Sequence, residues 1–260
     1  MYKLPNGIEI YQLNKIETDF LYKEIFLEEN YLKNGIELRE GAVVFDVGAN
    51  IGMFSLFVGT KCADYTLYAF EPVPPLYEIL KLNTERGGER VKAIPLGITD
   101  HEGKARFVFY PGMSVFSGQF AQTDRDKDLL RSILLNQYKE AITDEKLLNK
   151  FVGHFLENRF TEEVFDCQVT TVSRVISEYA VDHIDLLKID AEKSELQVLA
   201  GINEEDWEKI RQLVMEVHEA DAAFLADLEK LLGSKGYALT IEREKSFSNN
   251  DIYNCYARKQ

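Results

Sequence analysis

The sequence predicts an α/β fold, in which a mostly parallel β-sheet carries helices on both faces. Three observations lead to this prediction. Short apolar runs that are typical of strands alternate with longer segments of helical spacing. The run at residues 42–47 is apolar at nearly every position, as expected for a strand covered on both faces in the middle of a parallel sheet. Residues 237–242 and 252–257 are typical of an antiparallel pair that completes the sheet.

Residues 1–40 are expected to form a lead-in to this sheet. Residues 3–13 alternate around a Pro-Asn-Gly turn in the manner of a small hairpin. Phe20 and Ile25 mark one face of a helix over about residues 18–28. Its simplest role is to cap the core.

The turn after the first strand has the pattern D-x-G-x-N-x-G. Asp46 closes the strand, Gly48 and Gly52 flank the turn, and Asn50 lies between them. A dinucleotide-binding turn would have glycine in place of Asn50, because its backbone must approach a pyrophosphate. The pattern therefore favours a nucleoside ligand with little negative charge, and S-adenosylmethionine is the commonest of these. The N-terminus of the following helix would point its free N–H groups at this ligand.

Glu71 ends the second strand, about 20 residues further along the chain, and Pro72 follows it. A carboxylate at this position can accept hydrogen bonds from the two hydroxyls of a ribose. The combination of the turn and this acid is therefore more specific for a nucleoside than either feature alone.

At this point the sequence resembles the FkbM-type S-adenosylmethionine-dependent methyltransferases. The resemblance extends over roughly residues 20–220 and rests on four blocks: 44–55 (VFDVGANIGMFS), 70–72 (FEP), 187–192 (LKIDAE) with 195–201 (ELQVLAG), and 215–218 (MEVH). One position departs from the family pattern. The family usually has Glu-Gly after the Asp of the third block, whereas this chain has Glu192 followed by Lys193.

The resemblance implies a fold and a cofactor. The fold is the seven-stranded class I methyltransferase (Rossmann-like) fold, here as a single domain over residues 1–260, with S-adenosylmethionine as cofactor. It implies that Gly97, after the third strand, lies where such proteins line the adenine ring, and that the helix near residues 20–31 either gates the cofactor pocket or only caps the core. The expected cofactor-binding residues are Asp46, Gly48, Asn50, Gly52, Glu71, Pro72 and Gly97.

Three side chains are candidates for catalysis. Glu216 and His218 are two residues apart at the end of a strand, so they share a face, and Asp190 ends another core strand. We expect His218 to remove a proton from an acceptor hydroxyl, with Glu216 or Asp190 orienting it. Two alternatives remain: His218 is structural, or all three residues bind a divalent metal ion. Glu192 and Glu195 lie at the start of a helix, where capping explains them.

Residues 118–162 are expected to form a helical insertion. Two amphipathic segments, around 130–141 and 147–155, are present where the sheet needs only a loop. Their apolar faces are expected to pack against another surface of this protein or of a second copy. We favour a lid over the substrate site, and the alternative is a hairpin through which a homodimer forms.

The composition limits the partners of the chain. Asp and Glu number 44 against 30 Lys and Arg, which gives a formal net charge of −14. Such a charge repels phosphate backbones and anionic lipid, so neither nucleic acid nor a membrane is expected to bind. The N-terminus lacks a secretory signal, and the three cysteines have no C-x-x-C spacing. These features predict a cytoplasmic protein with reduced thiols.

The expected activity is O-methylation. Members of the family serve polyketide, nonribosomal peptide and sugar pathways, so the resemblance implies a hydroxyl of a small or carrier-bound intermediate as acceptor. It leaves open whether the chain acts alone or as a domain of a larger synthase. The alternatives are an NAD(P)-dependent oxidoreductase, which Asn50 disfavours, and a non-catalytic module that binds a nucleoside.

Overall fold

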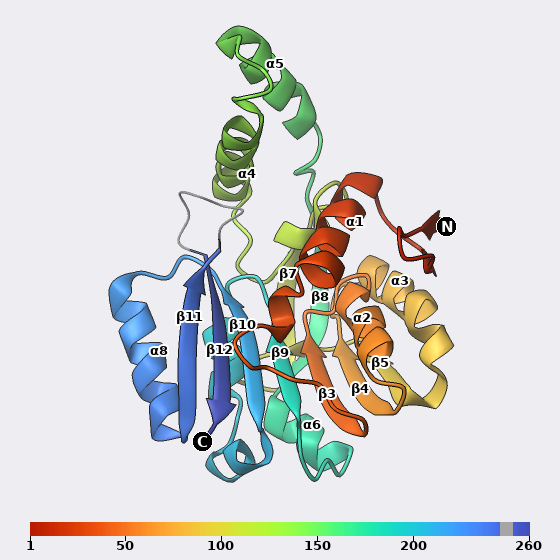
Figure 1. Cartoon of the computed structure of the whole chain (residues 1–260), viewed down its shortest axis with the longest axis vertical. Coiled ribbons are helices and arrows are strands. Elements are labelled where there is room, and N and C mark those ends of the chain that lie inside the picture. Colours follow the sequence, from red (N-terminus) through yellow and green to blue (C-terminus); the bar gives the residue numbers. More distant parts are fainter. Residues whose placement is uncertain (245–251) are drawn as a thin grey trace.

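A computed structural model describes residues 1–244 and 252–260, and within them seven strands form a central sheet (Figure 1). Across the sheet the strands are β11 (Tyr237–Arg243), β12 (Tyr253–Lys259), β10 (Gln212–Val217), β9 (Leu186–Ile189), β3 (Ala42–Val47), β4 (Tyr65–Phe70) and β5 (Val91–Ile94). Of these strands β12 runs opposite to the other six, so it pairs antiparallel with both β10 and β11. The predicted seven-stranded, mostly parallel sheet with an antiparallel C-terminal strand is confirmed.

Helices cover both faces of this sheet, as the sequence predicted (Figure 1). The helices that pack on one face are α1 (Lys15–Tyr22), α2 (Met53–Lys61) and α3 (Pro74–Thr84), and those on the other are α6 (Val172–Glu178), α7 (Glu195–Ala200) and α8 (Ala222–Ser234). Side chains of β3 alternate between the two cores: Val44 belongs to the first and Phe45 to the second, and both are almost fully buried. This explains the continuous apolar run in β3, because both faces of a central parallel strand are covered.

The N-terminal lead-in contains the predicted hairpin, with β1 (Tyr2–Lys3) antiparallel to β2 (Glu9–Ile10). The following helix begins at Lys15, three residues earlier than expected. Asn14 caps it by accepting a hydrogen bond from the backbone N–H of Glu17. The helix continues as a π-helical turn over Lys23–Leu27.

A second sheet, which the sequence analysis did not predict, lies beside the carboxyl ends of the central strands. In it β8 (Glu163–Thr170) pairs antiparallel with β7 (Gly103–Phe109) and parallel with β6 (Gly97–Ile98). Between β7 and β8 the chain forms a helical hairpin of α4 (Thr123–Tyr138) and α5 (Glu145–Leu156), which projects from the body of the molecule at the top of Figure 1. The two predicted helices of the insertion are therefore present.

The remaining short helical turns are 3-10 segments: Asn30–Leu32, Glu85–Arg90, Ser114–Phe116 and Glu204–Lys209. In the part of the chain that the structure describes, no helix combines the length and the apolar character needed to cross a lipid bilayer.

Candidate active site

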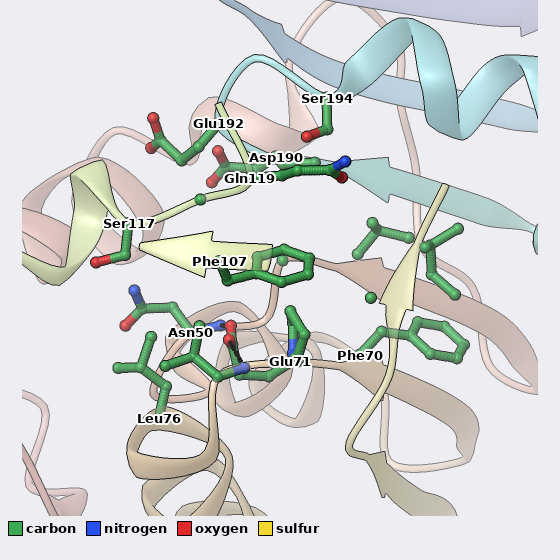
Figure 2. A pocket seen from close by; sticks show the side chains of 18 of the residues that line it. Asn50, Phe70, Glu71, Leu76, Phe107, Ser117, Gln119, Asp190, Glu192 and Ser194 are labelled. Atoms are coloured by element: carbon green, nitrogen blue, oxygen red, sulfur yellow. Dashed lines mark hydrogen bonds between the residues drawn. The ribbon is translucent and has the colours of Figure 1, made fainter. Parts of the chain in front are cut away.

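A pocket of about 80 Å³ lies beyond the carboxyl ends of β3, β4 and β9 (Figure 2). This is the edge of an open parallel sheet at which ligands usually bind. Five of the seven expected cofactor residues form part of its wall: Gly48, Asn50, Glu71, Pro72 and Gly97. The other two, Asp46 and Gly52, lie outside the wall, and their contacts give them different roles.

The glycines of the turn meet different neighbours. Gly48 has φ +71°, and a Cβ atom there would lie 1.8 Å from the carbonyl oxygen of Asp190. Only glycine fits so close to a neighbouring backbone. Gly52 has φ +88°, and its Cβ would meet Leu80 and Thr84 of α3 at 2.9 and 3.4 Å. Gly52 therefore allows α2 to begin against α3, and its expected contact with the cofactor stays a prediction.

Glu71 is held by the backbone of two turns. Its carboxylate accepts hydrogen bonds from the N–H of Asn50 and the N–H of Val73, each at 2.9 Å. Burial raises the pKa of Glu71 to about 7, although the two backbone N–H groups and the Lys188 ammonium favour the ionised form. A carboxylate has about four acceptor positions. Those that remain can receive ribose hydroxyls in the pocket.

A buried lysine lies beneath the turn. The Lys188 ammonium donates to the carbonyl of Gly48 at 2.9 Å and lies 3.1 Å from Asp46 Oδ1 and 3.6 Å from Asp190 Oδ2. Burial favours loss of its proton, but Asp46 and Asp190 outweigh this effect and raise the pKa of Lys188. Asp46 also accepts a hydrogen bond from Ser55 at 2.7 Å. Asp46 therefore holds the turn through Lys188, and its expected contact with the cofactor stays a prediction.

The sequence analysis missed Lys188. A signal was present, because Lys188 is a charged residue within the otherwise apolar run 186–189. A lysine is almost never fully buried without an anionic partner. Its position in a core strand therefore indicates a carboxylate nearby, and here it has two.

Behind Glu192, which lines the pocket, lies an imidazole among carboxylates. His218 Nε2 lies 3.3 Å from Glu216 and 3.5 Å from Glu192, and Nδ1 lies 3.1 Å from Glu195. Burial alone would lower the pKa of His218, but Glu192, Glu195 and Glu216 outweigh it and raise that pKa well above the ordinary value. Burial raises the pKa of Glu192 well above its usual range.

Glu192 is the member of this cluster that lines the pocket (Figure 2). The sequence analysis explained Glu192 and Glu195 by helix capping alone. Glu195 does accept a hydrogen bond from the backbone N–H of Lys193 at 2.9 Å. Both carboxylates nevertheless face His218, which capping does not explain, and no local sequence pattern reveals that contact.

Asp190 has other partners. Its carboxylate accepts a hydrogen bond from the Tyr31 hydroxyl at 2.9 Å and lies near Lys188. Over residues 1–244 and 252–260, no group of three or more His, Cys, Asp or Glu side chains is arranged to hold a metal ion. The alternative in which Asp190, Glu216 and His218 bind a metal therefore has no geometric support in this part of the chain.

The second sheet contributes residues that the sequence analysis did not consider. Phe107 of β7 points into the pocket, with Ser117 and Gln119 beside it (Figure 2). A Cβ at Gly97 would lie 2.9 Å from the Phe107 ring, so the absence of a side chain at Gly97 leaves room for that ring. In the sequence, Phe107 lies in an ordinary alternating strand, and Ser117 and Gln119 follow it without any recognisable motif.

A seven-stranded sheet of this order, with a glycine turn after β3 and a buried carboxylate after β4, defines a class I methyltransferase. The chain belongs to the FkbM methyltransferase family, because the family model described as the Methyltransferase FkbM domain matches residues 46–239. The cofactor of this class of enzyme is S-adenosylmethionine. The alternative of an NAD(P)-dependent oxidoreductase is therefore wrong.

Similar proteins come from several organisms. The chain is 38% identical over 257 residues to the 31-O-demethyl-FK506 methyltransferase FkbM of Streptomyces tacrolimicus, with 99% of this chain and 96% of that protein covered. It is 37% identical over 260 residues to the AMB antimetabolite synthetase AmbE of Pseudomonas aeruginosa, covering 98% of this chain but only 12% of the synthetase. It is 32% identical over 249 residues to the methyltransferase sdnD of Sordaria araneosa, with 91% and 88% covered.

Solved structures of low sequence identity also match. TrmK of M. capricolum in complex with S-adenosyl-homocysteine is 9% identical with a TM-score of 0.46, covering 90% of this chain and 68% of that one. Precorrin-6y C5,15-methyltransferase of Geobacter metallireducens is 9% identical with a TM-score of 0.45, covering 98% and 96%.

Proposed function

We propose that this protein is an S-adenosylmethionine-dependent O-methyltransferase that acts on a hydroxyl of a small or carrier-bound natural-product intermediate. One observation carries the proposal. A single pocket is lined by a buried carboxylate suited to a ribose, Glu71, and by a candidate proton acceptor, Glu192 (Figure 2), and His218 lies 3.5 Å behind Glu192.

The relatives support the acceptor class. The relative from Streptomyces tacrolimicus is named for methylation at an oxygen of a natural product, and AmbE is named as a synthetase of an antimetabolite. The first suggests a hydroxyl acceptor, and the second suggests that the acceptor belongs to an assembled metabolite. Both free and carrier-bound acceptors therefore belong in the test.

The pocket residues fit the parts of S-adenosylmethionine. Glu71 would receive the ribose hydroxyls, and Gly97 with Phe107 would face the adenine ring. When bound, this cofactor supplies an electrophilic methyl group on a sulfonium. Asp190, in the pocket wall beside Lys188, would face the polar end of the cofactor.

We assign removal of the acceptor's hydroxyl proton to Glu192, supported by His218 and Glu216. Methyl transfer to a hydroxyl requires that the oxygen be held in line with the methyl group and that its proton leave as the new bond forms. Glu192 lines the pocket, and because burial raises its pKa, its ionised form is a stronger base than an ordinary carboxylate. His218 lies behind it at 3.5 Å, and Glu216 supports His218 on the same side. The carboxylate of Glu192 would then hold the proton that leaves the acceptor hydroxyl.

A second pocket, of about 570 Å³, is assigned to the body of the acceptor. It lies between α1 and the helical hairpin, and its wall includes Phe20, Phe116, Leu134 and Phe155. Val115 lines both pockets, so an apolar acceptor held between the helices could present its hydroxyl past Val115 to the cofactor. This location favours the lid role for the hairpin.

The proposal is tested in two steps. Calorimetry with S-adenosylhomocysteine should show binding at one site per chain. S-adenosylmethionine with an isotopically labelled methyl group is then incubated with hydroxylated metabolites, free or attached to a carrier protein, and the products are analysed by mass spectrometry. Transfer of the label to oxygen supports the proposal, and transfer to nitrogen or carbon overturns the O-methyl assignment. Binding without transfer to any acceptor would favour the non-catalytic module.

A further inference from the structure

The loop between β9 and α7 holds two consecutive residues in a left-handed conformation. Glu192 has φ +45° and Lys193 has φ +73°, and neither is a glycine. Such angles cost free energy for a residue with a Cβ, and they persist only where the surrounding structure compensates for the strain. The side chain of Lys193 makes ionic contacts that can compensate for this strain.

Lys193 joins this loop to the first turn of the helical hairpin. Its ammonium donates to Asp126 Oδ1 at 2.8 Å and lies 3.1 Å from Glu219 Oε1. Glu219, which follows β10, also pairs with Arg125 of α4 at 2.9 Å. The Asp126 side chain is 2% exposed and that of Lys193 is 13% exposed. A pair so far removed from water is screened less than a surface pair, and losing one partner leaves a buried charge.

The two segments that Lys193 joins belong to different pockets. Asp190 and Glu192, beside Lys193, line the cofactor pocket. Leu130 and Leu134 of α4, one and two turns beyond Asp126, line the larger apolar pocket. A change at one pocket wall can therefore reach the other through this ion pair.

We propose that Lys193 is a positioning residue that fastens the helical hairpin to the loop at residues 190–194, so that cofactor binding orders the wall of the acceptor pocket. The inference rests on the proposed function for its assignment of the two pockets. Binding of the cofactor fixes the loop, the loop carries the ammonium, and the ammonium holds Asp126 and hence α4. Binding of the cofactor then strengthens binding of the acceptor, and by thermodynamic linkage binding of the acceptor strengthens binding of the cofactor to the same extent.

The first experiment needs no ligand. Three variants are compared: Lys193→Met removes the charge and keeps the backbone strain, Lys193→Gly removes both, and Lys127→Met makes the same charge change at an exposed position of α4. Hydrogen exchange of residues 123–134 should be at least about fivefold faster in both Lys193 variants and unchanged in Lys127→Met. Lys193→Gly should unfold at a higher temperature than Lys193→Met, because glycine tolerates the left-handed angle. Unchanged exchange in both Lys193 variants would refute the fastening.

The second experiment tests coupling with S-adenosylhomocysteine as probe. In the unmodified protein it should slow exchange in both 190–194 and 123–134, the latter by about fivefold or more. In both Lys193 variants and in Asp126→Asn it should still bind and slow the loop, but slow 123–134 by less than about twofold. The double variant Lys193→Gly with Asp126→Asn should be no worse than either single variant, as expected for one shared contact.

The possible failures are distinct. If calorimetry detects no binding of S-adenosylhomocysteine, the proposed function is wrong, and the ligand-free experiment still decides whether Lys193 fastens α4. If the probe binds and protects the loop but not α4 in the unmodified protein, the coupling is wrong while the proposed function stands. A purely structural role for Lys193 would lower the unfolding temperature of both variants and leave the probe-dependent protection of α4 intact.

Discussion

At the scale of single residues, the ionisation of Glu71 makes cofactor affinity depend on pH. Its pKa is raised to about 7 by burial, and ribose hydroxyls donate to the ionised form, so binding favours loss of the proton. Affinity for S-adenosylhomocysteine should therefore rise by up to about tenfold per pH unit as the pH approaches 7 from below, and level off above it. Calorimetry from about pH 5.5 to 8 measures this. Glu71→Gln should remove the dependence, and a variant with the same pH profile would contradict the assignment.

The proposed proton acceptors can be tested once a methyl acceptor is in hand. Glu192→Gln and His218→Ala should each lower kcat by about 10² to 10⁴. His218→Ala should leave affinity for S-adenosylhomocysteine nearly unchanged, because His218 lies behind the pocket wall. His101→Ala, at an exposed histidine, is the control. Activity that a strong chelator abolishes and Mg²⁺ restores would instead assign the cluster to a metal ion, and ordinary turnover of His218→Ala would refute its role.

Gly48 should tolerate no side chain. Gly48→Ala places a Cβ 1.8 Å from the Asp190 carbonyl oxygen at a φ of +71°, so the turn must shift. We expect a loss of about 2–4 kcal/mol in the free energy of unfolding and loss of S-adenosylhomocysteine binding. Gly153→Ala is the matched control. A Cβ at Gly153 meets nothing within 4 Å in α5, so this change should be neutral or stabilise by about 0.5–1 kcal/mol. If Gly48→Ala unfolded at the same denaturant concentration as the unmodified protein, the close contact between position 48 and the Asp190 carbonyl oxygen would be contradicted.

At the scale of elements, the helical hairpin has its own small core. Leu130 and Leu134 of α4 pack with Leu148 and Val152 of α5, apart from the two cores of the central sheet. An element that packs mainly on itself can open without disrupting the sheet. Its outer side exposes Leu147, which is 57% exposed, so the dimer alternative also has a surface available.

A lid and a dimer hairpin respond differently to dilution. If the hairpin is a lid, amides of residues 123–156 should exchange much faster than those of β3 and β9, at any protein concentration. An acceptor should then slow them. If the hairpin forms a dimer, its protection should fall on dilution, and Leu147→Lys should shift the mass measured by light scattering towards that of a monomer. Val164→Lys, at an exposed residue outside the hairpin, is the control.

At the scale of the whole molecule, the cofactor pocket lies where several segments distant in sequence meet, so a ligand there should stabilise the entire fold. At 100 times its Kd, S-adenosylhomocysteine should add about 2.7 kcal/mol to the free energy of unfolding. For a chain of this size that corresponds to an increase of roughly 5–10 °C in Tm. Glu71→Ala, expected to weaken binding at least tenfold, should lose about 1.4 kcal/mol of this gain at the same ligand concentration. An equal increase in both proteins would remove Glu71 from the site.

The sequence by itself determined the order of the central elements along the chain and several residues of the pocket wall. The apolar run of β3, the glycine turn with Asn50 and the acid at Glu71 are local patterns, because strand burial, left-handed turns and strand-end carboxylates depend on residues close together in the chain. The same patterns located the helical insertion. The start of α1 was missed, although Asn14 followed by Glu17 three residues later is a local capping signal that places it at Lys15.

Only the tertiary structure decided which side chains face the pocket and in which direction their pKa values shift. Asp46 and Gly52 lie in the predicted turn but contact Lys188 and α3, whereas Phe107 enters the wall from a second sheet. The pKa of His218 is raised by Glu192 and Glu195, which reach it from a different loop and helix. The physical reason is that burial and electrostatic interaction depend on distance in space, and segments far apart in the sequence set those distances.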